Sequence, residues 1–168
     1  MTDIDLDAHA RGLMDANLYV ILGTSDADGI PWTSPVYYAT ADYAELFWVS
    51  SSDARHSRNL AARPRLSMVI FDSTVPTYHG RAVYLSGTAA ELTGRDLDRG
   101  IEIFPGDPAR GGGPISVEDV TAPAAWRLYR ATISEAFVLC PREPREPCPL
   151  HGIDADHRTP VMPWRHPA

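Results

Sequence analysis

Lysine is absent from this 168-residue chain, and all 15 of its cationic Lys or Arg positions are arginines. This absence excludes chemistry through a lysine Schiff base, so a site that needs a positive charge must use arginine or histidine. Basic residues are also in the minority, because the formal net charge is −7 at pH 7. Nucleic-acid binders usually present a basic surface, and we therefore expect no nucleic-acid partner.

Long apolar runs are missing as well. No segment approaches the roughly 20 apolar residues that a membrane-spanning helix needs. The opening sequence MTDIDLDAHARG is acidic and lacks the basic and then apolar pattern of a secretory signal. We therefore expect no membrane partner and a cytoplasmic location. The length suits one domain over residues 1–140, followed by an extended C-terminal arm over residues 141–168 that holds seven of the 15 prolines.

Cysteine is scarce, and both cysteines flank or lie in that proline-rich arm. Cys140 and Cys148 stand eight residues apart, and a disulfide between them is not expected in a reducing cytosol. His151 and His157 follow closely, so the four side chains could in principle bind zinc. Their spacing fits no usual zinc-finger pattern, and we predict no metal site.

What the sequence does contain is a succession of β-prone segments. Apolar residues at helical spacing predict an opening helix over residues 5–16, and Asp28-Gly29 predicts a tight hairpin turn after the first strand. Gly87 predicts a bulge or bend in a later strand. Six strands are expected at residues 18–24, 32–39, 46–50, 65–71, 81–92 and 127–139. Helices are expected at residues 54–63, 95–104 and 117–122, and a flexible glycine-rich surface loop at 105–114.

This order of elements predicts a fold that is mainly β with a few helices (α+β). Six strands in mostly hairpin order favour a small antiparallel barrel, because closure removes the exposed edges of an open sheet. Along the last strand, Tyr129, Ala131, Ile133, Phe137 and Leu139 alternate with polar residues, which predicts that these five side chains share one buried face.

The segment SSSDARHSRNLAARP, residues 50–64, carries the strongest indication of function. Ser52 or Asp53 is expected to cap a helix that begins near Ala54 and ends before Pro64. A helix N-terminus attracts anions, and arginine can grip phosphate oxygens with two parallel N–H bonds. The segment therefore suits a phosphate group, although a capped surface helix with solvated arginines is the alternative that these residues leave open.

Three stretches in order extend that indication: TSDADGIPWTSPVYY, LFWVSSSDARHSRNLAARPRLSMVIFD and RAVYLSGTAAEL, with a weaker match in RLYRATISEAFVL. Together they resemble the pyridoxamine 5′-phosphate oxidase-like, FMN-binding split-barrel family over about residues 18–92. The resemblance implies a six-stranded antiparallel split β-barrel that forms a homodimer, with two flavin sites in clefts at the subunit interface.

The resemblance also implies a set of cofactor-binding residues and no catalytic side chain. His56 stands where family members usually have a lysine beside the arginine, and Phe137 stands where the oxidase has a tryptophan near the partner's flavin. The implied set is Thr33, Ser34, Pro35 and Val36 along the flavin ring; Val49, Ser50 and Ser51 at the ribityl chain or phosphate; Arg55, His56, Arg58 and Asn59 around the phosphate; and Ala82, Phe137 and Arg158 near the ring.

In a flavin protein the cofactor carries the redox chemistry, while the protein supplies position and electrostatics. The implied function is an FMN-dependent oxidoreductase that transfers hydride to or from a small substrate. Two alternatives stay open: a reductase that uses the deazaflavin coenzyme F-420, and a non-enzymatic flavin or haem protein with His79 or His151 as the axial haem ligand. Aromatic side chains either line the substrate space or pack in the core: Tyr37, Tyr38, Trp48 and Tyr78, together with His79.

Overall fold

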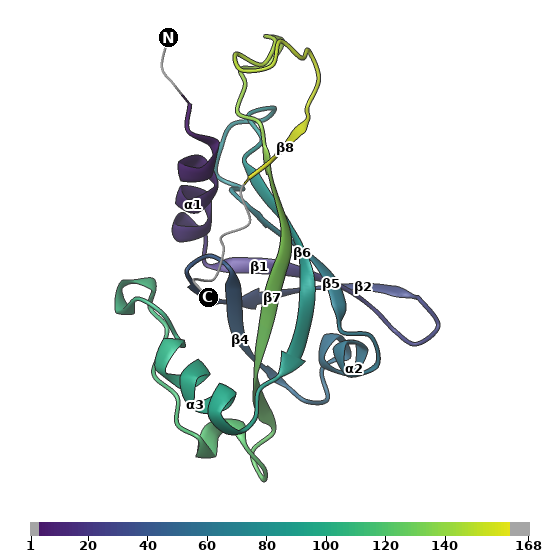
Figure 1. The fold of residues 1–168 in the computed structure, drawn as a ribbon, viewed down its shortest axis with the longest axis vertical. Helices are drawn as coiled ribbons and strands as arrows, with labels where there is room; N and C mark the ends of the chain where they lie inside the picture. Colours follow the sequence, from purple (N-terminus) through teal and green to yellow (C-terminus); the bar gives the residue numbers. More distant parts are fainter. Residues whose placement is uncertain (1–3, 162–168) are drawn as a thin grey trace.

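The computed structural model describes residues 4–161, which form a mainly β fold with three α-helices (Figure 1). The helices are α1 (Leu6–Ala16), α2 (Arg55–Ala62) and α3 (Gly94–Ile103), with 3-10 turns at Pro108–Arg110 and Glu118–Val120. The strands are β1 (Tyr19–Ser25), β2 (Pro31–Tyr37), β3 (Ala39–Ala41), β4 (Glu45–Ser51), β5 (Arg65–Phe71), β6 (Ala82–Glu91), β7 (Trp126–Leu139) and β8 (Arg158–Pro160). Among these elements no helix is long and apolar enough to cross a membrane.

All strands belong to one curled antiparallel sheet. Its order is β2-β1-β5-β6-β7-β4-β3, and β8 pairs with β7 beside this path. The six predicted strands are present, and β3 and β8 add two three-residue strands. Within the described residues the end strands β2 and β3 do not pair with each other, so the sheet curls as half of a barrel. The split-barrel fold class is confirmed.

The main core fills the inside of this curl. Trp48 and Tyr38 are fully buried there, and Trp48 stacks on Tyr129 with ring centroids 5.7 Å apart. The apolar face of α1 covers the core, and the Tyr38 hydroxyl donates a 2.6 Å hydrogen bond to the carbonyl of Met14 at its end. A second apolar cluster, including Phe47 on β4, packs under α3. Trp48 and Tyr38 are therefore core residues and not walls of a substrate space.

A bulge between β6 and β7 overturns part of the predicted strand pattern. Ser86 pairs with Glu135 while Gly87 pairs with Ile133, so one residue of β7 lies outside the pairing. A Cβ on Gly87 would lie 2.1 Å from the Thr132 carbonyl oxygen, which is why only glycine fits. The bulge reverses the alternation beyond it. Ala136 and Val138 are buried, while Phe137 and Leu139 stay partly exposed, so the prediction that these two share the buried face is wrong.

The glycine-rich loop at 105–114 is anchored to the end of α1. Arg110 donates hydrogen bonds to the carbonyls of Asp15 at 2.8 Å, Asn17 at 3.1 Å and Tyr38 at 3.2 Å. The contacts with Asp15 and Asn17 satisfy carbonyl groups at a helix end that have no partner within the helix. The predicted flexible surface loop is thus held at this point by one arginine.

The C-terminal arm folds back onto the sheet. In β8, Arg158 pairs with Leu139 and Pro160 pairs with Phe137, and Val161 is buried in the main core. The arm up to Val161 is therefore part of the fold, where an extended arm was predicted. Figure 1 shows it as the yellow loop that rises beyond β7 and returns as β8.

Candidate cofactor site

Two adjoining hollows lie on the outer face of the sheet, over β1, β2, β5 and β6. Their volumes are about 710 Å³ and about 420 Å³. Both are lined by the same four small residues, Gly23, Thr33, Ser67 and Ser86. A Cβ on Gly23 would lie 2.5 Å from the Ser67 Oγ, so any other residue at this position would have to displace the Ser67 side chain. The hollows exist because small residues occupy the outward positions of these strands.

The larger hollow opens beside the β1–β2 hairpin. Its further lining is Thr24, Ser25, Pro31, Trp32, Arg65, Leu66, Gly87, Thr88 and Ser134. The smaller hollow extends toward β8, where Tyr84, Phe137 and Arg158 form its wall. The Arg158 guanidinium carbon lies 3.8 Å from the centre of the Tyr84 ring, in a cation–π contact. Phe137 and Arg158, both predicted near the cofactor, therefore meet at one hollow.

A serine–histidine cluster joins α2 to the strands next to the larger hollow. The Nδ1 atom of His56 lies 3.1 Å from the Ser34 Oγ, and its Nε2 atom lies 2.8 Å from the Ser50 Oγ. The indole N–H of Trp32 donates to the Ser34 Oγ at 3.0 Å. Burial lowers the pKa of His56 below its ordinary 6.5, so this histidine is neutral at pH 7. The structure thus brings together three predicted residues from β2, β4 and α2.

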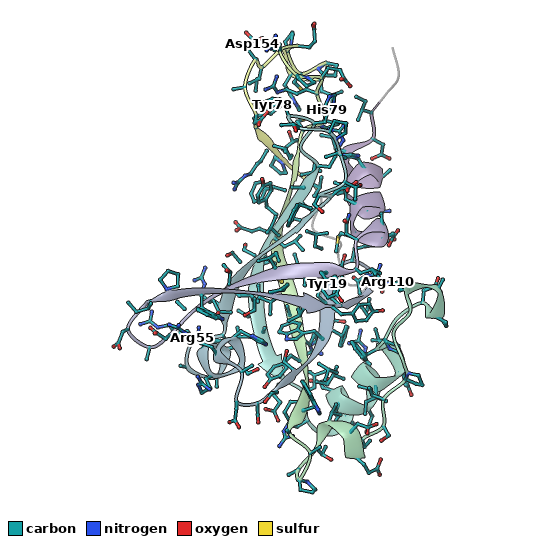
Figure 2. All side chains as sticks on the ribbon, turned by 180° about the vertical axis from the view of Figure 1, so that it is seen from behind. Tyr19, Arg55, Tyr78, His79, Arg110 and Asp154 are labelled. Carbon is teal, nitrogen blue, oxygen red and sulfur yellow. The ribbon has the colours of Figure 1, made fainter. Side chains whose placement is uncertain are left out.

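Arg55 supplies the positive charge at this end of the hollows. Its guanidinium carbon lies 4.4 Å from the centre of the Trp32 ring, and a guanidinium nitrogen lies 3.7 Å from a carboxylate oxygen of Asp26. The side chain is 39% exposed, so it can reach an anion as well as Asp26. Figure 2 shows Arg55 beside the β1–β2 hairpin, far from Tyr78, His79 and Asp154, which lie at the top of the view.

The start of α2 differs from the prediction. The N-cap is Ala54, and neither Ser52 nor Asp53 caps the helix with its side chain. Instead, the hydroxyl of Ser51 accepts a hydrogen bond from the N–H of Asp53 at 3.2 Å, and the backbone turns at this point. The first turn of α2 therefore carries no side-chain cap.

Two residues predicted at the phosphate point elsewhere. Arg58 donates to the carbonyl of Asp53 and lines a separate hollow between α2 and β6. Asn59 is buried, and its amide donates a 3.0 Å hydrogen bond to the Thr24 hydroxyl. Asn59 thus ties α2 to β1, and its placement favours a structural role.

The remaining predicted residues divide between core and surface. Val36 and Ala82 are buried at 7% and 6% exposure, and Val49 packs against the cluster under α3. Thr33 lines both hollows, Pro35 is exposed on β2, and Ser51 is partly exposed at the end of β4. Backbone groups of β2 could still face a ligand, as the resemblance implies.

Sequence reasoning missed the residues that create the hollows. Gly23, Ser67 and Ser86 were not singled out, yet they decide where the sheet can receive a ligand. The available signal was the placement of small residues at alternate positions within otherwise apolar strands. None of the five ring-bearing candidates for the substrate space, Tyr37, Tyr38, Trp48, Tyr78 and His79, lines either hollow.

Known proteins were compared with this chain by sequence and by structure. The family model described as pyridoxamine 5′-phosphate oxidase matches residues 6–140. A search of curated proteins found no match to the sequence.

Several solved structures share the fold at low sequence identity. A heme binding protein from Mycobacterium smegmatis is 18% identical with a TM-score of 0.67; the match covers 95% of this chain and 60% of that protein. HutZ, the heme storage protein from Vibrio cholerae, is 20% identical with a TM-score of 0.59, covering 80% and 95%. A protein from Listeria innocua, named as a candidate pyridoxamine 5′-phosphate oxidase, is 11% identical with a TM-score of 0.59, covering 80% and 98%.

Proposed function

The chain belongs to the pyridoxamine 5′-phosphate oxidase family, and from this premise we propose that it binds FMN in the two adjoining hollows and acts as a flavin-dependent oxidoreductase. The observation that carries the proposal is the pair of adjoining hollows that share Gly23 and run from Trp32, over whose ring Arg55 lies, to Phe137 and Arg158. A cofactor with a phosphate at one end and a flat ring system at the other matches this order of residues.

The size and shape of the hollows support the proposal. Ligand sites in proteins commonly measure about 300–1,000 Å³, and the two hollows fall within this range. Tyr84 and Phe137 offer aromatic surface for a flat ring, and Gly23 lets the ring approach the strand backbone.

The charges support it as well. Arg65 lines the larger hollow, Arg158 lines the smaller one, and Arg55 lies over the ring of Trp32 at the edge of the larger hollow, in a chain whose net charge is −7. His56 is neutral but sits beside Arg55, and a phosphate next to its ring would favour the protonated form. In this scheme Arg55 and the first turn of α2 bind the phosphate, while Ser34 and Ser50 orient His56. FMN, when bound, supplies the hydride chemistry.

The proposal includes a homodimer. Both hollows are open to the outside of this chain, and a half-barrel exposes the face that holds them. Trp32 and Phe71 are large apolar residues that lie 41% and 48% exposed on β2 and β5. A second copy would cover such residues and close the ligand site, as the resemblance to split-barrel flavoproteins implies.

Haem binding is the second candidate, because two of the similar structures are a heme binding protein and a heme storage protein. His79 is the candidate axial ligand, since its side chain is partly exposed and its Nδ1 atom lies 3.4 Å from a carboxylate oxygen of Glu143. His151 is engaged in the cluster of the arm. Coenzyme F-420 would need the same Arg55 end but has an acidic tail, which the net charge disfavours.

The test is titration of the purified chain with FMN, haem and F-420 in parallel, with molar mass measured by light scattering. We expect FMN to bind at one per chain in a dimer, with quenched flavin fluorescence. If the chain does not bind FMN but gains a Soret band with haem, and His79→Ala abolishes that band, the flavin proposal is wrong and the haem proposal takes its place. Binding of F-420 but not FMN would retain the site and change the cofactor.

A further inference from the structure

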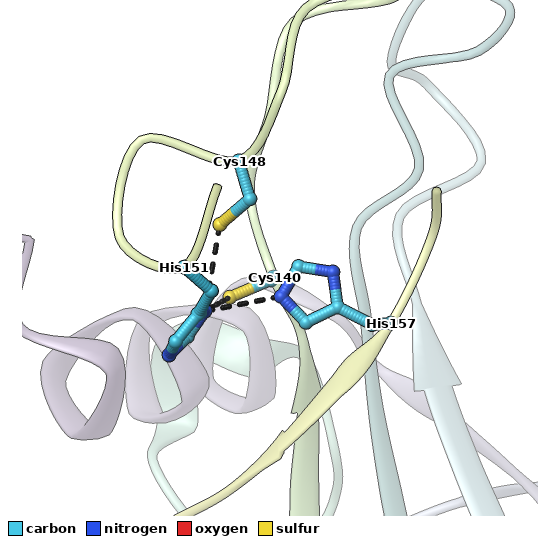
Figure 3. A group of neighbouring side chains, drawn as sticks. All are labelled: Cys140, Cys148, His151 and His157. Atoms are coloured by element: carbon cyan, nitrogen blue, oxygen red, sulfur yellow. Dashed lines mark hydrogen bonds between the residues drawn. The ribbon is translucent and has the colours of Figure 1, made fainter. Parts of the chain in front are cut away.

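A second cluster of reactive side chains lies in the arm, away from the hollows. Cys140 at the end of β7 meets Cys148, His151 and His157 from the loop that follows (Figure 3). Each residue offers one ligand atom, and these four atoms lie within 4.8 Å of one another. Both cysteines are free thiols and almost fully buried, at 3% and 1% exposure.

The spacing of these atoms matches a tetrahedral metal ion. The Nδ1 atom of His151 lies 3.4 Å from the Cys140 sulfur, 3.5 Å from the Cys148 sulfur and 3.0 Å from the His157 Nε2. With zinc bonds of about 2.3 Å to sulfur and about 2.0–2.1 Å to nitrogen, tetrahedral geometry sets sulfur and nitrogen about 3.6 Å apart and two nitrogens about 3.3 Å apart. The observed separations are close to these values.

Hydrogen bonds do not account for the same contacts. His157 must carry its proton on Nδ1, because that atom donates to the carbonyl of Ala155 at 3.0 Å. In the neutral ring its Nε2 is then an acceptor, so the 3.0 Å contact requires His151 to donate from Nδ1. That nitrogen cannot also accept from the thiols of Cys140 and Cys148, which lie 3.4 Å and 3.5 Å away. A shared cation satisfies all three contacts at once.

The backbone holds the four residues in this arrangement. The N–H of Cys148 donates to the carbonyl of Ile153 at 2.9 Å, and the N–H of Gly152 donates to the carbonyl of Cys148 at 2.8 Å. Gly152 has a φ of +68°, which glycine adopts without strain and which closes the turn from Cys148 to Ile153 that carries His151. The N–H of Cys140 donates to the carbonyl of His157 at 3.0 Å and fixes β7 against the returning chain.

We propose that Cys140, Cys148, His151 and His157 form a structural zinc site that fastens the C-terminal arm to the sheet. Two thiolates and two imidazoles suit zinc in its usual four-coordinate state, and four protein ligands leave no open position for catalysis. The Ala155 carbonyl holds the His157 ring in the orientation that turns Nε2 toward the ion. The contact of 3.4 Å between the Thr159 hydroxyl and the Cys140 sulfur adds a polar neighbour to one thiolate.

The site has a consequence for the smaller hollow. His157 directly precedes Arg158, and β8 follows as a strand of only three residues paired with β7. So short a strand has few hydrogen bonds of its own, and a metal ligand next to it would hold Arg158 over Tyr84. This consequence, unlike the zinc site itself, rests on the proposed cofactor function.

The test is the metal content of the chain, produced without a metal-binding tag in zinc-supplemented medium and measured by elemental mass spectrometry after gel filtration. We expect one zinc per chain in the wild type, and loss of that zinc in Cys148→Ser and in His151→Ala. His79→Ala is the matched control, because His79 lies beside the arm but outside the cluster, and it should keep its zinc. FMN titration of the same samples separates failure of the zinc site from failure of the flavin site.

Cobalt replacement tests the ligands without any mutation. We expect the wild type to take up Co²⁺ with the intense visible bands of a tetrahedral site and the near-ultraviolet charge-transfer bands of thiolate ligands. A wild type that holds no zinc, gives no such spectrum and shows two freely alkylated thiols would overturn the proposal. A disulfide between Cys140 and Cys148 in protein purified under reducing conditions would overturn it as well.

Discussion

Two clusters in this molecule are built around a histidine and differ in what their atoms require. In the first, each ring nitrogen of His56 has one serine hydroxyl as its partner, so hydrogen bonds satisfy the ring without any ligand. In the second, two sulfurs and one nitrogen converge on the Nδ1 atom of His151, and hydrogen bonds cannot satisfy all of them. Hydrogen bonds alone hold the first cluster together, while the second requires a cation at its centre.

In these two clusters, the residue types in the sequence and the placement of the residues in the fold give different information. The serine–histidine cluster stands in the segment with the strongest sequence motif, yet the ligand space beside it depends on small residues elsewhere on the sheet. The cysteine–histidine cluster has an unusual spacing in the sequence and a compact geometry in the fold. Convergence of side chains on one point is the better guide to a bound ion.

The largest expected effect is on stability. Removing zinc with a chelator should lower the melting temperature by roughly 10 °C, because zinc held at about 1,000 times its Kd contributes about 4 kcal/mol and each kcal/mol is worth about 2–4 °C in a chain of this size. Differential scanning calorimetry measures the shift. The same chelator should leave Cys148→Ser unchanged. Equal shifts in both proteins would mean that the chelator acts elsewhere.

The second largest effect is expected from a substitution that fills the hollows. Ser67 lines both hollows and is exposed, so Ser67→Leu should place a larger side chain in the ligand space with little change in the free energy of unfolding. We expect FMN affinity to fall roughly 100-fold, about 2.7 kcal/mol. Isothermal titration with Ser73→Leu as the control measures the effect, since Ser73 is exposed and lies outside the hollows. Unchanged affinity in Ser67→Leu would place the ligand elsewhere.

Removing the guanidinium of Arg55 should weaken FMN by about 1.5–3 kcal/mol, the usual value of a charge-assisted hydrogen bond. The change should appear in the dissociation constant and not in the stoichiometry. Arg95→Ala is the matched control, because Arg95 is an exposed arginine of α3 that lines neither hollow. If both variants lose affinity equally, the effect is one of overall charge.

The smallest effect concerns pH. Burial lowers the pKa of His56, so its ring is neutral at pH 7 in the protein without ligand, whereas a bound phosphate would favour the charged ring. FMN affinity should therefore rise as pH falls from 8 to 6, by up to about tenfold, and His56→Gln should flatten the profile. Without ligand, the pH dependence of the stability has the opposite sign, and the stability decreases as the pH falls. Because the folded pKa lies below the unfolded 6.5, the stability contributed by neutral His56 is present above pH 6.5 and is lost as pH falls toward the folded pKa. Fluorescence titration and thermal melts across this range check both directions.

Much of the fold could be predicted because its signals are local. Strand β5 was predicted at its observed bounds, since alternation of apolar and exposed residues over 65–71 needs no knowledge of the partner strand. The Asp28-Gly29 turn is present as well, with Gly29 at a φ of +87°. Of the candidate site, Ser34, Ser50 and His56 were predicted and meet, because family resemblance gives residues that β2, β4 and α2 bring together.

The errors share one physical cause. The cap of α2 at Ser52 or Asp53, the face of Phe137 and the extended arm were each predicted from neighbours in the sequence. The observed outcomes depend on distant partners: the bulge opposite Gly87 turns Phe137 outward, and pairing with β7 folds the arm back. A bulge is a property of two paired strands, so one strand's sequence does not reveal on which side the extra residue falls.

The sequence by itself determined the six longer strands, the turn at Asp28-Gly29 and the absence of lysine, since these follow from backbone preferences and composition over a few residues. Tertiary structure alone decided which small residues open a hollow and whether Cys140 meets His157. Those outcomes depend on distances between segments that only the packed sheet sets, because side-chain chemistry acts over a few ångströms regardless of separation along the chain.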